Sequence, residues 1–339
     1  MRALRLPLGK VPLDILQSVV FKNLGAERKE VVLGPHVGVD GAIVEVGNKD
    51  MITSMDPITG ALERIGWLAV NVNANDIATF GIRPTFFSSC ILLPELTGVK
   101  TIETMCKQMD MAARGLGMAI IGGHCEATPG ITHPIIIGSA VGITEKDRYV
   151  TSGGAKPGDL LILTKGLGVE GTAILATDKR ELLKSRFSRA FLERASDFFS
   201  RISVVEEAVL AFENGGVTAM HDPTEGGVSG GIHEIADASN LGVEVFERKI
   251  SIRLETLEIC RFFEIDPMQL VSSGALLIAA KKDFADGVIE TLKKRSIEAA
   301  VIGEFLKEQE KRVFIRKNGK REPLIRPVSD HLWKALKQE

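Results

Sequence analysis

The chain has 339 residues, 45% of them hydrophobic, which is enough for two domains of ordinary size with a large core. Its formal net charge of −2 argues against a general binder of nucleic acid or of membrane surfaces, because such proteins carry a basic excess. No apolar run reaches the length of a membrane span, and the N-terminal stretch lacks the apolar core of a signal peptide, so we expect a cytoplasmic enzyme. The cysteines are scattered and form no CxxC pair, which argues against a zinc or redox motif.

The first half of the chain is predicted to alternate strands with helices. A basic loop and a short helix are expected within residues 5–25, followed by two strands around a Gly-rich loop within 31–46. Further strands are expected at residues 51–56, 85–93 and 133–144, and helices at about 60–80 and 99–117. The strand 51–56 is expected to end in a turn at Asp56-Pro57, and residues 118–123 to form a strand followed by a Gly-rich turn.

The stretch TSGGAKPGD (residues 151–159) is the best candidate for a domain boundary, because it combines paired glycines with a Pro-Gly turn and has one apolar residue. Beyond it, apolar strands again alternate with helices, and a hairpin is expected about Asn318-Gly319. We therefore predict two domains of the α+β or α/β class, residues 1–150 and residues 151–339.

The predicted helix 60–80 carries an unusual polar patch near its C-terminal end. Asn71, Asn73, Asn75 and Asp76 interrupt an otherwise apolar, amphipathic helix, although Asn and Asp are poor formers of helix interiors. Asn73 and Asp76 are three residues apart and share one face. The patch is either a solvated face or part of a functional site, in which Asn73 orients a phosphate or a metal-bound water.

Five carboxylates lie beside apolar strands or helices, mostly in turns rich in Gly or Pro: Asp40, Asp56, Asp76, Glu126 and Asp222. A single carboxylate in such a turn is most often a cap or an Asx-turn. Several that converge from different elements would instead hold Mg²⁺ against a triphosphate. We predict all five as metal ligands, and Asp76, Asp222 and Asn73 as the catalytic set.

Glycines and one lysine are predicted to contact the phosphates of a nucleotide. Gly226 and Gly227 open a predicted helix, whose free N–H groups suit phosphate binding. Gly122 and Gly123 are predicted to bind the nucleotide as well. Lys10 is placed to reach phosphates from the N-terminal loop, with an ordinary surface lysine as the alternative.

Three other motifs do not support the chemistry that they suggest. Residues 166–171 spell GxGxxG after a strand, but the long helical stretch that follows does not return promptly to a second parallel strand, so NAD binding by a dehydrogenase is not expected. His233-Glu234 lacks the second histidine of a zinc protease. His124-Cys125-Glu126 is either an acid/base cluster or a small-residue segment of a Gly-rich turn.

The sequence resembles the PurM-like ATP-binding superfamily, and within it the branch that contains the hydrogenase maturation factor HypE and the proteins related to aminoimidazole ribonucleotide (AIR) synthase. The resemblance spans roughly residues 5–280, in family order. It is carried by the motifs LPLGKVPLDIL, GPHVGVDGAIVEV, SMDPITG, NVNANDIATFGIRPTFF, GGHCEATPGI, KPGDLLILTKGLGVEGTAIL, HDPTEGGVSGGIHEIA and SSGALLIA.

The resemblance implies an N-terminal α+β domain whose strands pair across a homodimer, a C-terminal α/β domain, and ATP with Mg²⁺ in the cleft between them. By motif position it assigns ligand or phosphate roles to Asp40, Asp56, Asn73, Asp76 and Asp222. In GGHCEATPG the relatives have an acidic residue after the two glycines, where this chain has His124, so Glu126 is the nearest carboxylate.

The C-terminal sequence departs from that of HypE, which ends in a cysteine that carries the reacting group. This sequence ends in LWKALKQE, and its last cysteine is Cys260. We therefore expect a Mg²⁺-dependent enzyme that uses ATP to phosphorylate or activate a carbonyl or amide-type oxygen of an unknown small-molecule or protein acceptor. The alternative is a non-catalytic homodimer that senses nucleotide or serves as an assembly partner in a maturation complex.

Overall fold

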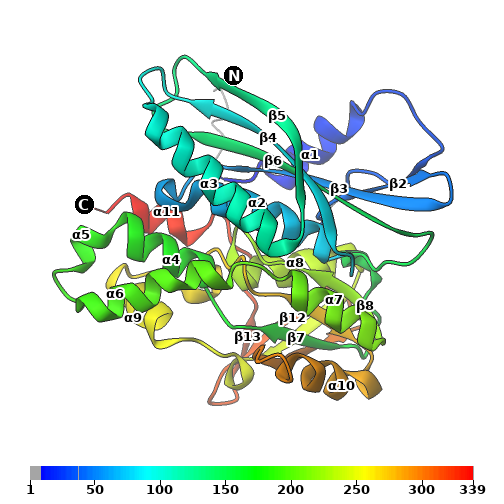
Figure 1. Cartoon of the computed structure of the whole chain (residues 1–339). Coiled ribbons are helices and arrows are strands. Elements are labelled where there is room, and N and C mark those ends of the chain that lie inside the picture. Colours follow the sequence, from blue (N-terminus) through cyan, green and yellow to red (C-terminus); the bar gives the residue numbers. More distant parts are fainter. Residues whose placement is uncertain (1–8, 37, 339) are drawn as a thin grey trace, which may run out of the picture.

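The computed structural model describes residues 9–36 and 38–338, which form two sheets with helices packed on them (Figure 1). The first sheet has six strands in the order β1-β2-β3-β6-β4-β5. Its neighbours pair antiparallel except for β4 and β5, which are parallel. The strand bounds are β1 Val31–Leu33, β2 Ala42–Val46, β3 Lys49–Ile58, β4 Pro84–Leu93, β5 Ala119–Ala127 and β6 Ile135–Glu145.

Helices α2 (Ile65–Ala78) and α3 (Val99–Leu116) cover one face of this sheet, where alternate residues of β3 and β6 are buried. Helix α2 lies between the sheet and the second half of the chain (Figure 1). It is buried on all sides, as expected for a helix that packs against neighbours all round. The polar patch that we predicted on an amphipathic helix therefore has no solvated face.

The second sheet has seven strands in the order β13-β12-β9-β11-β7-β10-β8. The bounds are β7 Leu160–Thr164, β8 Val217–His221, β9 Gly242–Phe246, β10 Leu277–Ala280, β11 Ala299–Leu306, β12 Arg312–Ile315 and β13 Arg321–Pro323. Both neighbours of β7 run antiparallel to it. The GxGxxG loop that follows β7 therefore does not belong to a parallel βαβ unit, and the topology agrees with the prediction that it is no dinucleotide-binding fingerprint.

The remaining helices surround the second sheet, apart from α1 near the N-terminus. Their bounds are α1 Leu13–Ser18, α4 Val169–Asp178, α5 Arg180–Leu183, α6 Arg189–Ser196, α7 Val205–Asn214, α8 Gly227–Ala238, α9 Leu254–Phe262, α10 Lys282–Lys293 and α11 His331–Leu336. Short 3₁₀ turns occur at Val20–Lys22, Leu62–Arg64, Ser152–Gly154, Asp197–Arg201, Glu247–Lys249 and Pro267–Gln269. No helix among residues 9–36 and 38–338 is both long and apolar enough to cross a membrane.

Two local predictions were wrong. Asp56-Pro57 lies inside β3, which continues to Ile58, because both residues are in register with β6. Gly122 and Gly123 lie inside β5 and pair with β4, where an added side chain at Gly123 would lie 2.0 Å from the Ser89 carbonyl oxygen. Close strand pairing, and not a turn, thus explains these glycines.

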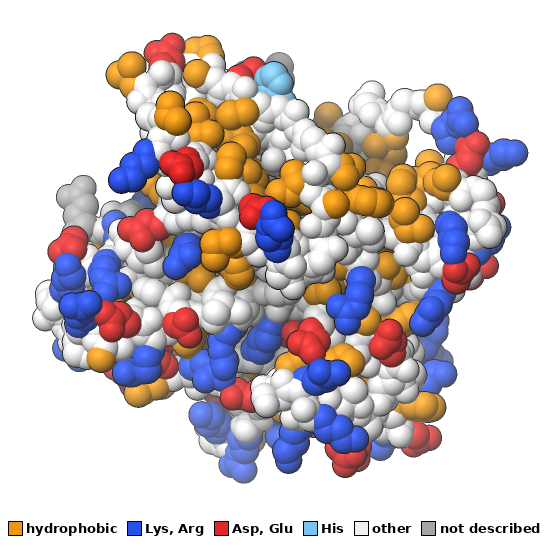
Figure 2. Space-filling model, in the orientation of Figure 1, with side chains coloured by type: hydrophobic (Ala, Val, Ile, Leu, Met, Phe, Trp, Pro, Cys, Tyr) orange, Lys and Arg blue, Asp and Glu red, His pale blue; other side chains and the backbone are white. Residues whose placement is uncertain are grey.

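No helix within residues 9–36 and 38–338 covers the other face of the first sheet, which is largely apolar. Met51, Thr53 and Met55 of β3 point to it, opposite Ile143, Val141 and Ser139 of β6. Met55 is 66% exposed and Ile143 is 48% exposed. Figure 2 shows hydrophobic side chains gathered over the strands of the first sheet, whereas the visible face of the second half is mainly charged.

Candidate functional site

A cavity of about 560 Å³ lies where the loops and strand ends of the two sheets meet. Four of the five predicted metal ligands line it. Asp40 comes from the loop before β2, Asp56 from β3, Asp76 from α2, and Asp222 from the residue after β8. The structure thus brings together carboxylates that are far apart in the sequence, as the prediction required.

Asp222 is the most unusual member of this group. It is 1% exposed, and neither of its carboxylate oxygens has a hydrogen-bond partner among the described residues. Ligand atoms of Asp40, His221 and Asp222 lie within 4.8 Å of one another. Burial, and then the nearby charge of Asp40, raises the pKa of Asp222 to about 8. A buried carboxylate without partners is costly, and a hard divalent cation is the ligand that it fits best.

Asp56 and Asp76 have weaker acidity for the same reasons. Burial raises the pKa of Asp56 to about 6, and it raises the pKa of Asp76 well above its usual value. The other carboxylates of the cavity add to both shifts. Ser54 donates a hydrogen bond of 2.5 Å to Asp76, which is one of the few groups that favour its charged form. The cavity therefore gathers carboxylates whose charged forms a bound cation would stabilise.

His221 was not predicted, yet it is central to the site. It is 2% exposed, and its Nδ1 lies 2.8 Å from one carboxylate oxygen of Asp40. Its Nε2 lies 2.8 Å from Glu234 of α8. Burial alone would lower the pKa of His221, but the two carboxylates outweigh it and raise the pKa to about 10. His221 is therefore a charged imidazolium that joins the loop before β2 to α8.

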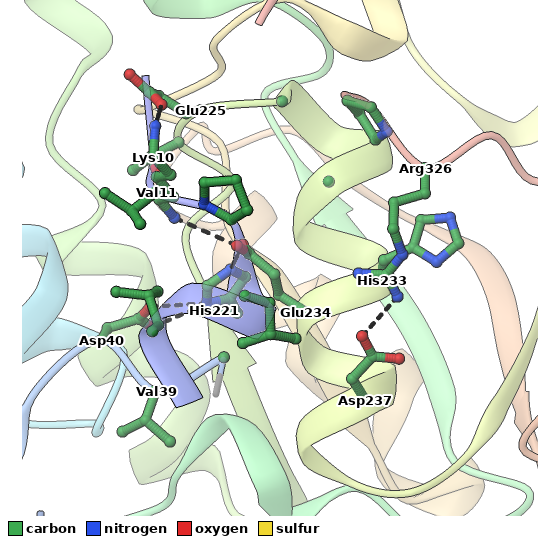
Figure 3. Close-up of a pocket in the computed structure, with 18 of the residues that line it drawn as sticks. Lys10, Val11, Val39, Asp40, His221, Glu225, His233, Glu234, Asp237 and Arg326 are labelled. Carbon is green, nitrogen blue, oxygen red and sulfur yellow. Dashed lines mark hydrogen bonds and ion pairs between the residues drawn. The ribbon is translucent and has the colours of Figure 1, made fainter. Parts of the chain in front are cut away.

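Lys10 lies at the cavity, but its partners are carboxylates of the second half of the chain. Its Nζ lies 3.3 Å from Glu234, and its backbone N–H donates to Glu225 at 2.7 Å. Figure 3 shows Lys10, Glu234, His221 and Asp40 side by side, joined by these contacts. The lysine that we predicted to bind phosphate thus stands beside the carboxylates and retains an exposed side chain.

Asn73, which we predicted as a catalytic residue, does not line the cavity. Its side chain is fully buried, accepts a hydrogen bond from the Asp56 N–H at 2.9 Å, and donates to the carbonyl oxygens of Asp56 at 3.2 Å and Ala69 at 2.9 Å. These backbone contacts use both ends of the amide, so the prediction of a phosphate contact by Asn73 is not supported. Its role is to hold Asp56 in place.

The neighbouring asparagines also bind backbone groups. Asn75 donates to the carbonyl oxygen of Ile202 and accepts from the N–H of Val204, both at 2.8 Å, which ties α2 to the second half of the chain. Asn71 donates to the Trp67 carbonyl oxygen one turn earlier in the same helix.

The glycines at the start of α8 have their N–H groups already bound. Gly226 lines the cavity, and its N–H donates to Asp330 at 2.7 Å. The N–H of Gly227 donates to the carbonyl oxygen of Thr224. A carboxylate of the chain itself therefore occupies the place at which we predicted a phosphate.

Gly122, Gly123 and Glu126 lie away from the cavity, on the exposed strand β5. Glu126 lies 3.1 Å from His124 and accepts a hydrogen bond from Thr128. The structure does not bring Glu126 to the other predicted metal ligands, because the segment is a strand at the edge of the first sheet and not a mobile turn.

A second cavity of about 400 Å³ adjoins the first and shares Lys10, Asp56 and Glu225 with it. Its wall is largely apolar and includes Ile58, Val72, Ile174, Val271, Leu332 and Trp333. Glu170 of α4 lines it, and burial raises the pKa of Glu170 to about 7 against the opposing effect of the Ser273 hydroxyl. Sequence reasoning missed Glu170, whose only signal was a carboxylate in an otherwise apolar helix.

Comparison with known proteins gives the family. The family model described as the N-terminal domain of AIR synthase related protein matches residues 38–144, and the model of its C-terminal domain matches residues 156–316. Carbamoyl dehydratase HypE of Rhizobium leguminosarum bv. viciae is 30% identical over 245 residues, 70% of this chain and 67% of that protein. The chain belongs to the AIR synthase-related family, in its HypE branch.

Further comparisons cover almost the full length of the chain. A Methanocaldococcus jannaschii protein, provisionally named for hydrogenase expression or formation, is 29% identical over 95% of both chains. Solved structures of HypE, one in complex with HypF and one in complex with ATP, match with TM-scores of 0.77 and 0.73. They cover 92% and 97% of this chain and 99% and 98% of their own, at 22% and 20% identity, so this likeness shows the two-domain PurM-like fold.

Proposed function

We propose that the chain is a Mg²⁺-dependent enzyme that binds ATP and uses it to phosphorylate or activate a carbonyl or amide-type oxygen of an acceptor. The observation that carries this proposal is Asp222, a buried carboxylate with no hydrogen-bond partner among the described residues, at a cavity that Asp40, Asp56 and Asp76 also line. The HypE relatives are named carbamoyl dehydratase, and one HypE structure contains ATP, which supports this choice of nucleotide and of acceptor oxygen.

The proposal gives the residues of the cavity separate roles. Asp40 and Asp222 would hold the metal ion, with Asp56 and Asp76 as the further carboxylates that meet metal or metal-bound water. Bound Mg²⁺ supplies charge neutralisation at the phosphates. Lys10, which extends from the N-terminal segment and lines the same cavity, would contact phosphate oxygens.

The adjoining cavity is where we place the acceptor. It is mostly apolar, and it opens beside Asp56 and Lys10, so a molecule in it would lie next to the phosphates. Glu170, with a pKa near neutrality, would accept the proton of the attacking group there. A mostly uncharged organic molecule suits this wall better than a polyanion does.

Calorimetric titration with ATP, with and without Mg²⁺, tests the proposed site. The wild-type chain is expected to bind ATP only with the metal present, and Asp222→Ala and Asp76→Ala are expected to weaken that binding at least tenfold. Glu126→Ala serves as the control, because Glu126 lies away from the cavity. Equal binding by all four proteins would contradict the site, as would the absence of any binding.

A second candidate is a nucleotide-binding homodimer that does not turn over ATP and acts as a sensor or assembly partner. The uncovered apolar face of the first sheet and the complex of HypE with HypF favour it. An assay for release of ADP or AMP from Mg²⁺-ATP distinguishes the enzyme from the sensor. Water and added carbamoyl compounds serve as acceptors in this assay. Binding without release would support the sensor.

We also keep two structural proposals from the sequence. The first is that residues 1–150 and 151–339 are the two domains. It is supported by the end of β6 at Glu145 and the start of β7 at Leu160. The second is that two copies of the chain pack through the uncovered face of the first sheet, because a large apolar face on a single chain is otherwise unfavourable in water.

A further inference from the structure

Four charged side chains form a continuous chain of contacts between the N-terminal segment and the proposed metal site. Lys10 Nζ lies 3.3 Å from Glu234 Oε1, Glu234 Oε2 lies 2.8 Å from His221 Nε2, and His221 Nδ1 lies 2.8 Å from Asp40 Oδ1 (Figure 3). The His221 ring lies between the carboxylates of Asp40 and Glu234, and Lys10 is at the far end of the chain of contacts. We call these four residues the charged relay.

The relay joins the loop before β2 to β8 and α8 in the second half of the chain. Asp40 belongs to a loop of the first domain, whereas His221 and Glu234 belong to β8 and α8 of the second. Gly38, two residues before Asp40, has φ +71° and lies so close to α8 that an added side chain would be 2.6 Å from the Glu234 carbonyl oxygen. The loop is therefore pressed against α8, with the Asp40 carboxylate facing His221.

This arrangement places Asp40 beside Asp222. Asp222 follows His221 in the sequence, and neither of its carboxylate oxygens has a hydrogen-bond partner in the described part of the chain. One of these oxygens lies within 4.8 Å of ligand atoms of Asp40 and His221. Asp40 reaches this position from another domain, so its orientation depends on the group that holds it. Metal-binding side chains are generally oriented by such hydrogen-bonded neighbours, and loss of a neighbour typically lowers metal affinity about 10–100-fold.

We propose that His221 is a positioning residue that fixes Asp40 beside Asp222, and that Glu234 and Lys10 act on the metal site through His221. The inference rests on the proposed function, because the ion concerned is the one that Asp40 and Asp222 would share. Both ring nitrogens of His221 already contact carboxylates, so the imidazole orients a ligand and is not a ligand itself.

Binding of Mn²⁺ to the full-length chain, measured from the electron paramagnetic resonance signal of the free ion, tests the relay. Glu234→Ala is expected to weaken Mn²⁺ binding several-fold, and His221→Ala about 10–100-fold. His221→Asn, whose amide can still donate to Asp40, is expected to recover part of the loss. Asp237→Ala is the matched control, since Asp237 lies on the same helix, is equally exposed, and pairs with Arg312 and Arg326 outside the relay (Figure 3).

A double variant separates the relay from simple loss of negative charge. A purely electrostatic effect of Glu234→Ala would persist in the His221→Ala background, whereas the relay predicts that it disappears there. Bound Mn²⁺ in the wild-type protein is expected to show no ¹⁴N coupling from an imidazole.

Three results would each overturn the positioning role of His221 while leaving the metal site intact. They are wild-type Mn²⁺ affinity in Glu234→Ala, an undiminished effect of Glu234→Ala on Mn²⁺ affinity in the His221→Ala background, and ¹⁴N coupling that His221→Asn removes. Absence of Mn²⁺ binding to the wild-type chain would instead overturn the site and this inference together.

Discussion

Asn73 and Asp56 are joined by two hydrogen bonds, from the Asp56 N–H to the Asn73 side-chain oxygen at 2.9 Å and from the Asn73 side-chain nitrogen to the Asp56 carbonyl oxygen at 3.2 Å. A side chain of α2 thus completes the backbone pairing of β3 at the residue whose carboxylate faces the cavity. Asn is a poor helix former, but the side chain of Asn73 fixes the position of Asp56. This contact explains why the polar patch of α2 includes Asn73.

Asn73→Ala is expected to lower the free energy of unfolding by about 1–3 kcal/mol, because it leaves the buried N–H of Asp56 unpaired. It should also weaken Mg²⁺-dependent ATP binding through displacement of Asp56. Asn71→Ala is the control, since the side chain of Asn71 donates a hydrogen bond to the Trp67 carbonyl oxygen within its own helix. Denaturant unfolding and calorimetry measure both effects, and equal losses in the two variants would contradict the role of Asn73.

Gly138→Ala tests the same contact from β6. Gly138 is in register with Asp56, and an added side chain would lie 2.4 Å from the side-chain nitrogen of Asn73. The variant is expected to lose about as much stability as Asn73→Ala, measured by denaturant unfolding. Gly115→Ala in α3, where an added side chain meets nothing within 4 Å, should be neutral or slightly stabilising. A neutral Gly138→Ala would be inconsistent with tight packing at Asn73.

The metal-free protein is expected to become less stable as the pH rises from about 4 to about 8. The folded-state pKa of Asp222, about 8, lies above the unfolded value near 4, so the unfolded chain binds fewer protons in this range and gains from rising pH. Asp56 acts in the same direction up to about pH 6. Asp222→Asn removes the contribution of Asp222, so its Tm in EDTA should exceed the wild-type Tm by several degrees at pH 8 and by little at pH 4. Parallel Tm profiles for the two proteins would refute this assignment.

The uncovered face of the first sheet is expected to be buried between two copies of the chain. Met55→Lys places a charge on that face, so it should convert a wild-type dimer to a monomer in size-exclusion chromatography with light scattering. Val99→Lys, at an 80% exposed position of α3 on the other side of the sheet, should leave the dimer intact. A monomeric wild-type protein would contradict the proposed packing of two copies through this face.

The sequence predicted the elements and the central carboxylates well for identifiable reasons. Helix α2, the strands β4 and β6 and the antiparallel hairpin β12–β13 follow from apolar periodicity and turn residues. Asp40, Asp76 and Asp222 interrupt apolar segments, where a charge has no structural reason to be, and the structure brings all three to one cavity.

The remaining features depend on packing between distant segments, which no local pattern encodes. The partner of Asn73 depends on how β3 packs against α2. The relay from Lys10 to Asp40 needs the two domains in contact. Gly226 resembled a phosphate-binding glycine because the sequence did not show that Asp330, 104 residues later, accepts its N–H. Likewise, Glu126 resembled a ligand because a glycine pair can open a turn or allow close strand pairing.

The central claim is that Asp40 and Asp222 hold a metal ion between the two domains, against the phosphates of ATP. A crystal structure of the chain with Mn²⁺ and a non-hydrolysable ATP analogue tests it directly through the anomalous signal of Mn²⁺. We predict a Mn²⁺ peak in contact with carboxylate oxygens of Asp40 and Asp222, and phosphates in the cavity of about 560 Å³. A peak at Glu126 on β5, or a nucleotide bound in another cavity, would contradict the account.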